Sequence, residues 1–258
     1  MSLQARRAGA VFLLLVGALH SFRAGRKASG IRFHSGVRIG FAVLVLALTG
    51  SCVSAVESGP PIANPADLAA RVRGETGASV PATLRFEWRY ADRRGDVGGE
   101  GIGRYNPPDS LRIDLFTSGD VAMAIAVADG QLRSLGEIED IRIPGLAFVY
   151  AMAGLFRPSE GRAEGYVAGS DSVLVYGDDA VRRTYFYVRE GRLRRVEERV
   201  HGRTVQRVNL DWVNSGPWPS RAEYRNLDEH SRVRWEVGEI THHTESHPAS
   251  AYDLPRVP

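Results

Sequence analysis

Cys52 is the only cysteine among the 258 residues of this chain, and its surroundings point more clearly to a reaction than those of any other residue. A single thiol excludes an intramolecular disulfide and a metal site built from several thiolates. The apolar stretch Ile39–Thr49 precedes Cys52, with only Gly50 and Ser51 between them. The role of Cys52 must therefore be explained from this one residue and the segment before it.

The segment Leu48-Thr49-Gly50-Ser51-Cys52 resembles the bacterial lipobox, in which a diacylglycerol is joined to the thiol and a peptidase cuts before the cysteine. It departs from the common pattern at Thr49, where leucine is usual. We expect lipid attachment at Cys52. Two alternatives stay open: Cys52 follows an ordinary signal peptide, or Ile39–Thr49 remains uncut as a short anchor. All three interpretations place the remaining chain outside the cytoplasm.

Residues 1–51 are expected to be a leader, because their two apolar stretches, Ala10–Leu19 and Ile39–Thr49, have the length of signal-peptide cores and fall short of a spanning helix. One export signal suffices, and a valine codon can start translation in bacteria, so Val37 is a candidate true start. Residues 52–63 would form the lipidated cysteine and a flexible tether. The folded domain is expected over 64–256.

The charge distribution excludes nucleic acid as a partner. Of the 33 basic groups, seven lie in residues 1–52, which hold no acidic group, and the remaining 26 face 30 acidic groups. The sequence pI of about 9.2 therefore belongs to the leader. A mildly acidic domain lacks the positive surface that phosphate contacts require.

Catalytic and metal-binding patterns are weak in this sequence. It contains no Gly-x-Ser-x-Gly elbow, no His-Glu-x-x-His and no P-loop, so we expect no enzyme, no cofactor and no metal. His242, His243 and His247 lie near the end of an expected strand, where neighbouring side chains point to opposite faces. The arginine run from Arg192 to Arg195 is expected to pair with Glu197 and Glu198 on a solvated face.

A short helix and a long series of strands would position these residues. Asn64-Pro65 is typical of a helix start, with the helix running to about Thr76 and burying Leu68 and Val72. From Thr83 to Tyr90 apolar and charged residues alternate, which predicts a strand with one buried face. Strands are also expected at Val97–Tyr105, where glycines suggest close backbone approach, at Leu111–Leu115, and at Val121–Ala128, which is apolar on both faces and should be central.

Asp129-Gly130 predicts a hairpin turn. After it, Pro144–Phe156 is apolar on all sides and long enough for three helical turns, so it must be buried or cover a hollow. Short strands then resume at Glu164–Ala168, Ser172–Tyr176, Val181–Arg189, Arg192–Val200, Thr204–Val213, Ser220–Leu227 and Arg232–Thr241. This order predicts a mainly β fold: a curled antiparallel sheet, or incomplete β-barrel, with an N-terminal helix and one central apolar lid helix.

This order of elements resembles the LolA/LolB superfamily of periplasmic lipoprotein carriers and receptors. The local resemblance is carried by Gly99 to Leu115 (GEGIGRYNPPDSLRIDL), the Asp129-Gly130 turn, the helix at Pro144 and the closing Ala251–Pro255 segment. The carrier's lid-locking arginine falls on Pro107 here, and Arg112 fits the strand after the turn, which favours a tethered relative of the receptor. The resemblance implies an incomplete barrel that binds lipid or lipoprotein acyl chains.

A curled sheet with large apolar side chains on its concave face can enclose acyl chains, since each buried methylene contributes about 0.8 kcal/mol. The candidate cavity-lining residues are Phe86, Trp88, Tyr90, Leu111, Ile113, Leu115, Met123 and Ile125 on the sheet, with Phe148, Met152 and Phe156 from the lid helix. The same alternation is also typical of an ordinary filled core.

Three functions follow from these observations. The first is a non-enzymatic lipoprotein, anchored in the cell envelope through Cys52 and facing the periplasm, that binds or transfers an acyl chain. The outer membrane is favoured because Val53 carries no acidic retention signal. The second is a structural or assembly lipoprotein with a filled interior that acts through envelope protein partners. An extracytoplasmic hydrolase is a remote third. A continuous apolar cavity of roughly several hundred cubic ångströms favours the first, and a packed interior favours the second.

Overall fold

The computed structural model describes residues 59–118, 120–136, 143–177, 181–213 and 216–254. The leader, Cys52 and most of the tether lie outside the described residues, so their interpretation stays a prediction. No helix within the described ranges is long and apolar enough to cross a membrane.

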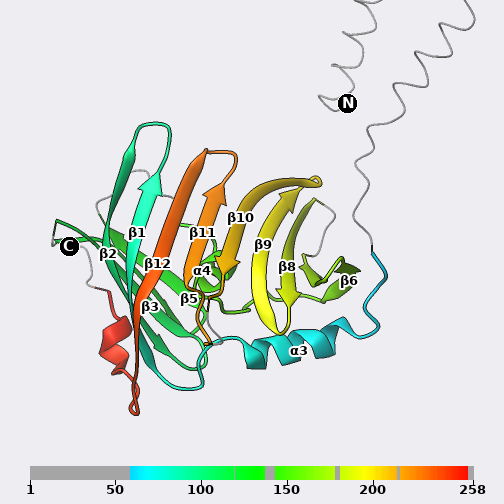
Figure 1. The fold of residues 1–258 in the computed structure, drawn as a ribbon, viewed down its shortest axis with the longest axis horizontal. Helices are drawn as coiled ribbons and strands as arrows, with labels where there is room; N and C mark the ends of the chain where they lie inside the picture. The colour runs from blue at the N-terminus through cyan, green and yellow to red at the C-terminus, as the bar shows by residue number, and fades with distance from the viewer. Residues whose placement is uncertain (1–58, 119, 137–142, 178–180, 214–215, 255–258) are drawn as a thin grey trace, which may run out of the picture. The chain divides into compact units, whose positions relative to one another are not determined.

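Twelve strands form one antiparallel sheet in the order β5-β4-β3-β2-β1-β12-β11-β10-β9-β8-β7-β6. The sheet is open, with β5 and β6 at its edges, and it curls so that α4 lies inside the curve (Figure 1). The fold is therefore mainly β, as the sequence predicts. The strands are β1 (Ala82–Ala91), β2 (Asp96–Asn106), β3 (Ser110–Thr117), β4 (Asp120–Ala128), β5 (Gln131–Gly136), β6 (Glu164–Ala168), β7 (Asp171–Tyr176), β8 (Arg182–Arg189), β9 (Arg192–Val200), β10 (Arg203–Asp211), β11 (Arg221–Asn226) and β12 (Ser231–His242).

β1 lies near the middle of the sheet, between β2 and β12, and shows the predicted alternation. Leu84, Phe86, Trp88 and Tyr90 are buried on the concave face, while the intervening charged residues are exposed. Trp88 is paired with Gly99 on one side and Trp235 on the other. The side-chain period of two in the sequence thus fixes which face of the sheet forms the core.

The helix α3 (Pro65–Glu75) confirms the predicted helix start. The Asn64 side chain accepts a hydrogen bond from the backbone N–H of Asp67 at 3.3 Å, and Pro65 occupies the first turn. Val72 is fully buried in the core. Capping by asparagine satisfies an N–H group that no helical carbonyl can reach.

The helix α4 (Leu146–Met152) is shorter than predicted, with seven residues in place of three turns. Gly154 has a φ of +76°, and the backbone N–H groups of Ala153, Gly154 and Leu155 bond to carbonyls of Tyr150 and Ala151. This left-handed glycine ends the helix, although Leu155 and Phe156 beyond it remain buried. The prediction of a single helix to Phe156 was therefore wrong.

β4 is apolar on both faces as predicted, but it is not central, because it is the second strand from the sheet edge. Its outer face is covered by the C-terminal segment, which includes the short 3-10 helix η1 (Ala249–Tyr252) and the buried Tyr252. The apolar residues on both faces of β4 are therefore explained by the C-terminal segment that covers its outer face, and they do not require a central position in the sheet.

Candidate functional site

The concave face of the sheet and α4 bring all eleven predicted cavity residues into one apolar cluster. Each of them is at most 9% exposed. Most of the sheet residues face α4 across a small void, while Phe148 packs against Tyr224 and Phe156 packs against Phe186.

The void beneath α4 has a volume of about 40 Å³. Its lining is entirely apolar or aromatic and comprises Trp88, Tyr90, Ile113, Leu115, Met123, Ile125, Ile143, Pro144, Val149, Met152, Val233 and Trp235. A second void of about 20 Å³ lies beside it, lined in part by Phe86, Leu111 and Pro219. Ligand cavities usually measure roughly 300–1,000 Å³, so with α4 in place the interior is almost filled.

Polar atoms around the larger void all have partners. The indole N–H of Trp88 donates to the carbonyls of Glu100 and Phe116 at 2.9 and 3.2 Å, and that of Trp235 donates to the carbonyl of Met152 at 3.2 Å. The Tyr90 hydroxyl donates to the Asp92 carboxylate at 3.3 Å. Because these polar groups are bonded within the protein, the void offers a water molecule few polar partners.

The glycines of β2 let aromatic rings lie against the strand backbone. Gly101 is paired with Phe86, and a Cβ atom at position 101 would lie 2.3 Å from the Phe86 ring. At Gly99 a Cβ atom would lie 2.0 Å from the carbonyl oxygen of Phe116. The close approach predicted from the glycines is therefore confirmed, and the side chains of β1 fill the space.

Both methionines of the described residues line the larger void. Met123 comes from β4 and Met152 from the last turn of α4, and the third methionine of the chain, Met1, lies outside the described residues. Methionine is unbranched and polarisable, so it adapts to irregular apolar surfaces and is favoured where ligands of variable shape bind. Two flexible side chains, Met123 and Met152, thus border the void.

The helix α4 is tied to the turn between β2 and β3 by polar contacts at its C-terminal end. The Tyr150 hydroxyl donates to the backbone carbonyl of Asp109 at 2.6 Å. Burial, together with the negative charge of Asp109, raises the pKa of Tyr150 to about 12, so the hydroxyl remains a donor. The Tyr105 hydroxyl holds the same turn through the carbonyl of Pro108 at 2.9 Å.

Arg157 is a residue beside the candidate site that the sequence analysis did not identify. Its side chain is only 9% exposed, and it donates to the carbonyls of Pro108 and Phe156, each at 2.9 Å, while pairing with the Asp109 carboxylate. The Pro107-Pro108-Asp109 turn thus receives a guanidinium from the segment after α4, although Pro107 occupies the position where the carrier resemblance places an arginine. The only feature of the sequence that could have pointed to Arg157 was its position directly after the apolar segment Pro144–Phe156.

Arg112 lies on the outer face, in agreement with its assignment to the strand after the turn. It pairs with the buried Asp114 at 2.9 Å and donates to the carbonyls of Ala251 and Asp253 at 3.1 and 3.0 Å. Arg104 pairs with the same carboxylate at 2.5 Å. These contacts hold the C-terminal segment against β3 and β4.

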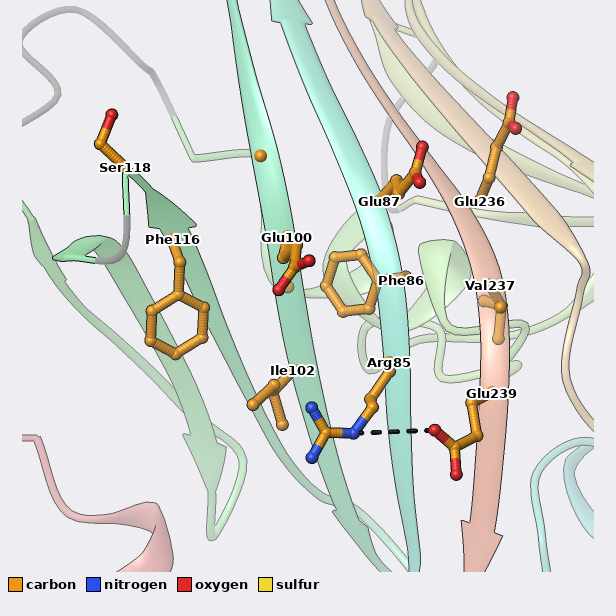
Figure 2. A pocket seen from close by; sticks show the side chains of 13 residues that line it. Arg85, Phe86, Glu87, Glu100, Ile102, Phe116, Ser118, Glu236, Val237 and Glu239 are labelled. Carbon is orange, nitrogen blue, oxygen red and sulfur yellow. Dashed lines mark ion pairs between the residues drawn. The ribbon is translucent and has the colours of Figure 1, made fainter.

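A much larger groove, of about 950 Å³, is open on the outer face of β12, β1 and β2. Figure 2 shows Glu87, Glu100 and Glu236 along it, with Arg85 reaching Glu239 at 3.8 Å. Phe116 and Ile102 contribute apolar surface. The groove lies on the opposite side of the sheet from α4 and includes no nucleophile placed beside a base.

The C-terminal residues His243 and His247 contact the start of β1. His243 shares a hydrogen bond with the Thr83 hydroxyl at 2.9 Å, and the ring of His247 lies 3.2 Å from the carbonyl of Ala82. Their rings are 4.8 Å apart. Among the described residues no group of three potential metal ligands occurs.

Comparisons with known proteins return structures only: no family model and no curated protein matches the chain. It is similar to a LolA superfamily protein from Nitrosomonas europaea (10% identity, TM-score 0.48, covering 74% of this chain and 97% of that one). A DUF1329 family protein from Desulfovibrio piger gives 10% identity, a TM-score of 0.48 and coverages of 75% and 100%. A putative outer membrane lipoprotein-sorting protein domain from Vibrio parahaemolyticus gives 7%, 0.40, 71% and 94%. The superfamily that the sequence resembles is therefore among these solved structures.

Proposed function

We propose that this chain is a membrane-anchored envelope lipoprotein, attached through Cys52, that binds an acyl chain of a lipid or lipoprotein on the concave face of its sheet. Under this proposal, α4 covers the binding surface in the form described above. The observation that carries the proposal is the apolar α4 itself, which seals an apolar surface and leaves a small void against it.

A void of about 40 Å³ cannot hold an acyl chain, so binding requires α4 to move. Its sequence context suits such a movement. Pro144-Gly145 precedes the helix and Gly154 follows it, and seven residues are too few to form a stable helix without tertiary packing. If α4 moved away, an acyl chain would take the place of the Val149 and Met152 side chains against the sheet. The apolar surface of the sheet would then remain covered, by the ligand in place of the helix.

Lipid that co-purifies with the full-length protein tests this function. Native mass spectrometry of protein extracted from membranes is expected to show a non-covalent lipid in addition to the covalent anchor. Binding of a fluorescent fatty acid should follow, with competition by the co-purified lipid. Protein that carries no additional lipid and does not bind the probe would contradict acyl-chain binding.

The second candidate is a structural or assembly lipoprotein that acts through protein contacts. The small volume of the interior voids favours it, because a packed core has no need of a ligand. Under this function, the full-length protein binds no fatty acid, and loosening α4 lowers stability without creating an affinity for lipid.

A further inference from the structure

Six arginines gather over the outer face of β9 to β12, around two buried carboxylates. Glu197, whose side chain is 2% exposed, contacts Arg207, Arg199 and Arg195 at 2.9, 2.8 and 3.5 Å. Glu223, whose side chain is 9% exposed, is contacted in the same way by Arg221, Arg225 and Arg234. We call the six the arginine layer: Arg195, Arg199, Arg207, Arg221, Arg225 and Arg234.

The register of the sheet joins the two groups into one surface. Arg207 on β10 is paired with Glu197 on β9 and with Arg225 on β11. Two of the guanidiniums lie over aromatic rings, with Arg195 at 3.9 Å from the centre of the Tyr187 ring and Arg199 at 4.5 Å from that of Tyr185. The guanidiniums are thus fixed in place by strands and stacking.

An approaching anion meets guanidinium groups before carboxylates. The arginine side chains are between about a fifth and a half exposed, whereas both central carboxylates lie buried beneath them. Asp211 and Glu236 at the rim contact only Arg221 and Arg234, at 3.9–4.0 Å, so positive charge remains in excess. Arg195, Arg207 and Arg221 contact the two central carboxylates at 3.5, 2.9 and 3.7 Å, and their side chains are still 36%, 35% and 38% exposed.

We propose that the arginine layer binds phosphate head groups of an anionic membrane surface. The planar guanidinium matches phosphate oxygens with two parallel N–H bonds, and six of them on a rigid sheet present this chemistry over an extended area. The choice of a membrane over a free phosphate rests on the proposed anchorage at Cys52.

The length and exit point of the tether support this partner. Pro60 and Ile62 form backbone hydrogen bonds with β6, so the described chain starts at the sheet edge three strands from β9. The seven residues after Cys52, Val53 to Gly59, span at most about 25 Å, and three strand spacings measure roughly 15 Å. A lipid on Cys52 would therefore keep the arginine layer within reach of the membrane that holds it.

Arginine modification of the full-length lipidated protein tests the proposal. The protein is placed in vesicles of phosphatidylcholine alone or with added phosphatidylglycerol and treated with phenylglyoxal, and modified residues are identified by peptide mass spectrometry. With phosphatidylglycerol, modification of Arg195, Arg207 and Arg225 should slow several-fold, and high salt should abolish the difference. Arg133, exposed on the edge strand β5 five strands away from β12, is the internal control and should react equally in both.

Variants provide a second test that does not depend only on the reactivity of the wild-type protein. Arg221→Gln combined with Arg225→Gln should reduce the protection of Arg207, whereas Arg133→Gln on the edge strand β5 should not. Equal rates in both kinds of vesicle would overturn the proposal, as would equal protection by inorganic phosphate in phosphatidylcholine vesicles. Protein recovered outside the vesicles would contradict the anchor instead, and sedimentation of that soluble protein with phosphatidylglycerol vesicles would still decide whether the layer binds them.

Discussion

The hydroxyl of Tyr150 on α4 donates a hydrogen bond to the backbone carbonyl of Asp109, 2.6 Å away in the turn between β2 and β3. Arg157 binds the side chain of the same aspartate. One turn therefore carries both polar ties at the C-terminal end of α4. In the proposed function these ties stabilise the form in which α4 fills the binding site.

Tyr150→Phe should loosen α4 and thereby strengthen acyl-chain binding. Loss of the hydrogen bond is expected to cost about 1 kcal/mol of unfolding free energy. Because helix and ligand compete for one surface, the apparent affinity for a fluorescent fatty acid should rise by up to about fivefold. Thermal unfolding and probe titration of the full-length protein measure the two effects.

Tyr187→Phe is the matched control for this variant. The Tyr187 hydroxyl is also hydrogen-bonded, accepting from Arg199 at 2.8 Å, but it lies on the outer face. This variant should lose comparable stability without any change in fatty-acid affinity. A loss of affinity in Tyr150→Phe, or an equal gain in both variants, would refute competition between α4 and the ligand.

Gly101→Ala and Gly103→Ala should differ in stability although they lie two residues apart on one face of β2. The new Cβ atom at position 101 would meet the Phe86 ring at 2.3 Å, whereas at position 103 the nearest atom is 3.6 Å away. Forcing the ring aside is expected to cost about 1–3 kcal/mol. Urea unfolding of both variants checks this, and equal stability would show that the ring does not depend on the glycine.

Acid should weaken the outer face through Glu197. Burial alone would raise the pKa of this carboxyl, but the hydrogen bond from Arg199 and the charges of Arg207 and Arg195 outweigh it and lower the pKa below the ordinary value of 4.5. A carboxyl whose pKa is lower in the folded state than in the unfolded state stabilises the fold at pH values above its unfolded pKa. This stabilisation is lost as the pH falls through the folded-state pKa. Unfolding free energy should therefore decrease below about pH 4.5.

Glu197→Gln isolates this contribution, because the amide does not titrate in this range. The variant should be less stable than wild type at neutral pH and should show a shallower loss of stability in acid. Glu87→Gln, at an exposed position on β1, should retain the wild-type dependence. Parallel acid profiles for wild type and Glu197→Gln would rule out the role assigned to Glu197.

Arg112→Ala should release the C-terminal segment from β3 and β4. The substitution removes the hydrogen bonds to the carbonyls of Ala251 and Asp253, while Asp114 retains Arg104 as a partner. Backbone amides of residues 249–254 should exchange hydrogen for deuterium faster, with the strands of the core unchanged. Arg85→Ala is the exposed control, and unaltered exchange in Arg112→Ala would show that other contacts hold the segment.

The strands and the buried face were predictable because they depend on local alternation. Leu84, Phe86 and Trp88 are two residues apart, and a strand must place them on one face. The glycines of β2 indicated the close approach that Gly101 and Phe86 make. The helix cap at Asn64 was equally local, since its partner is the N–H of Asp67.

Long-range contacts were not predictable from the same patterns. β4 was expected at the centre because both faces are apolar, yet one face is covered by η1 from the other end of the chain. Arg157 reaches a turn 48 residues earlier. Alternation also cannot distinguish a hollow from a filled interior, because that depends on how deeply α4 packs into the curve.

Photo-crosslinking of a diazirine-bearing fatty acid to the full-length lipidated protein tests the central claim most directly. Acyl-chain binding beneath α4 predicts crosslinks in the peptides of β1, β4 and α4, at residues such as Trp88, Met123 and Met152, with unlabelled fatty acid suppressing them. Crosslinks confined to the outer face, or none that unlabelled fatty acid suppresses, would contradict the binding of an acyl chain within the curled sheet.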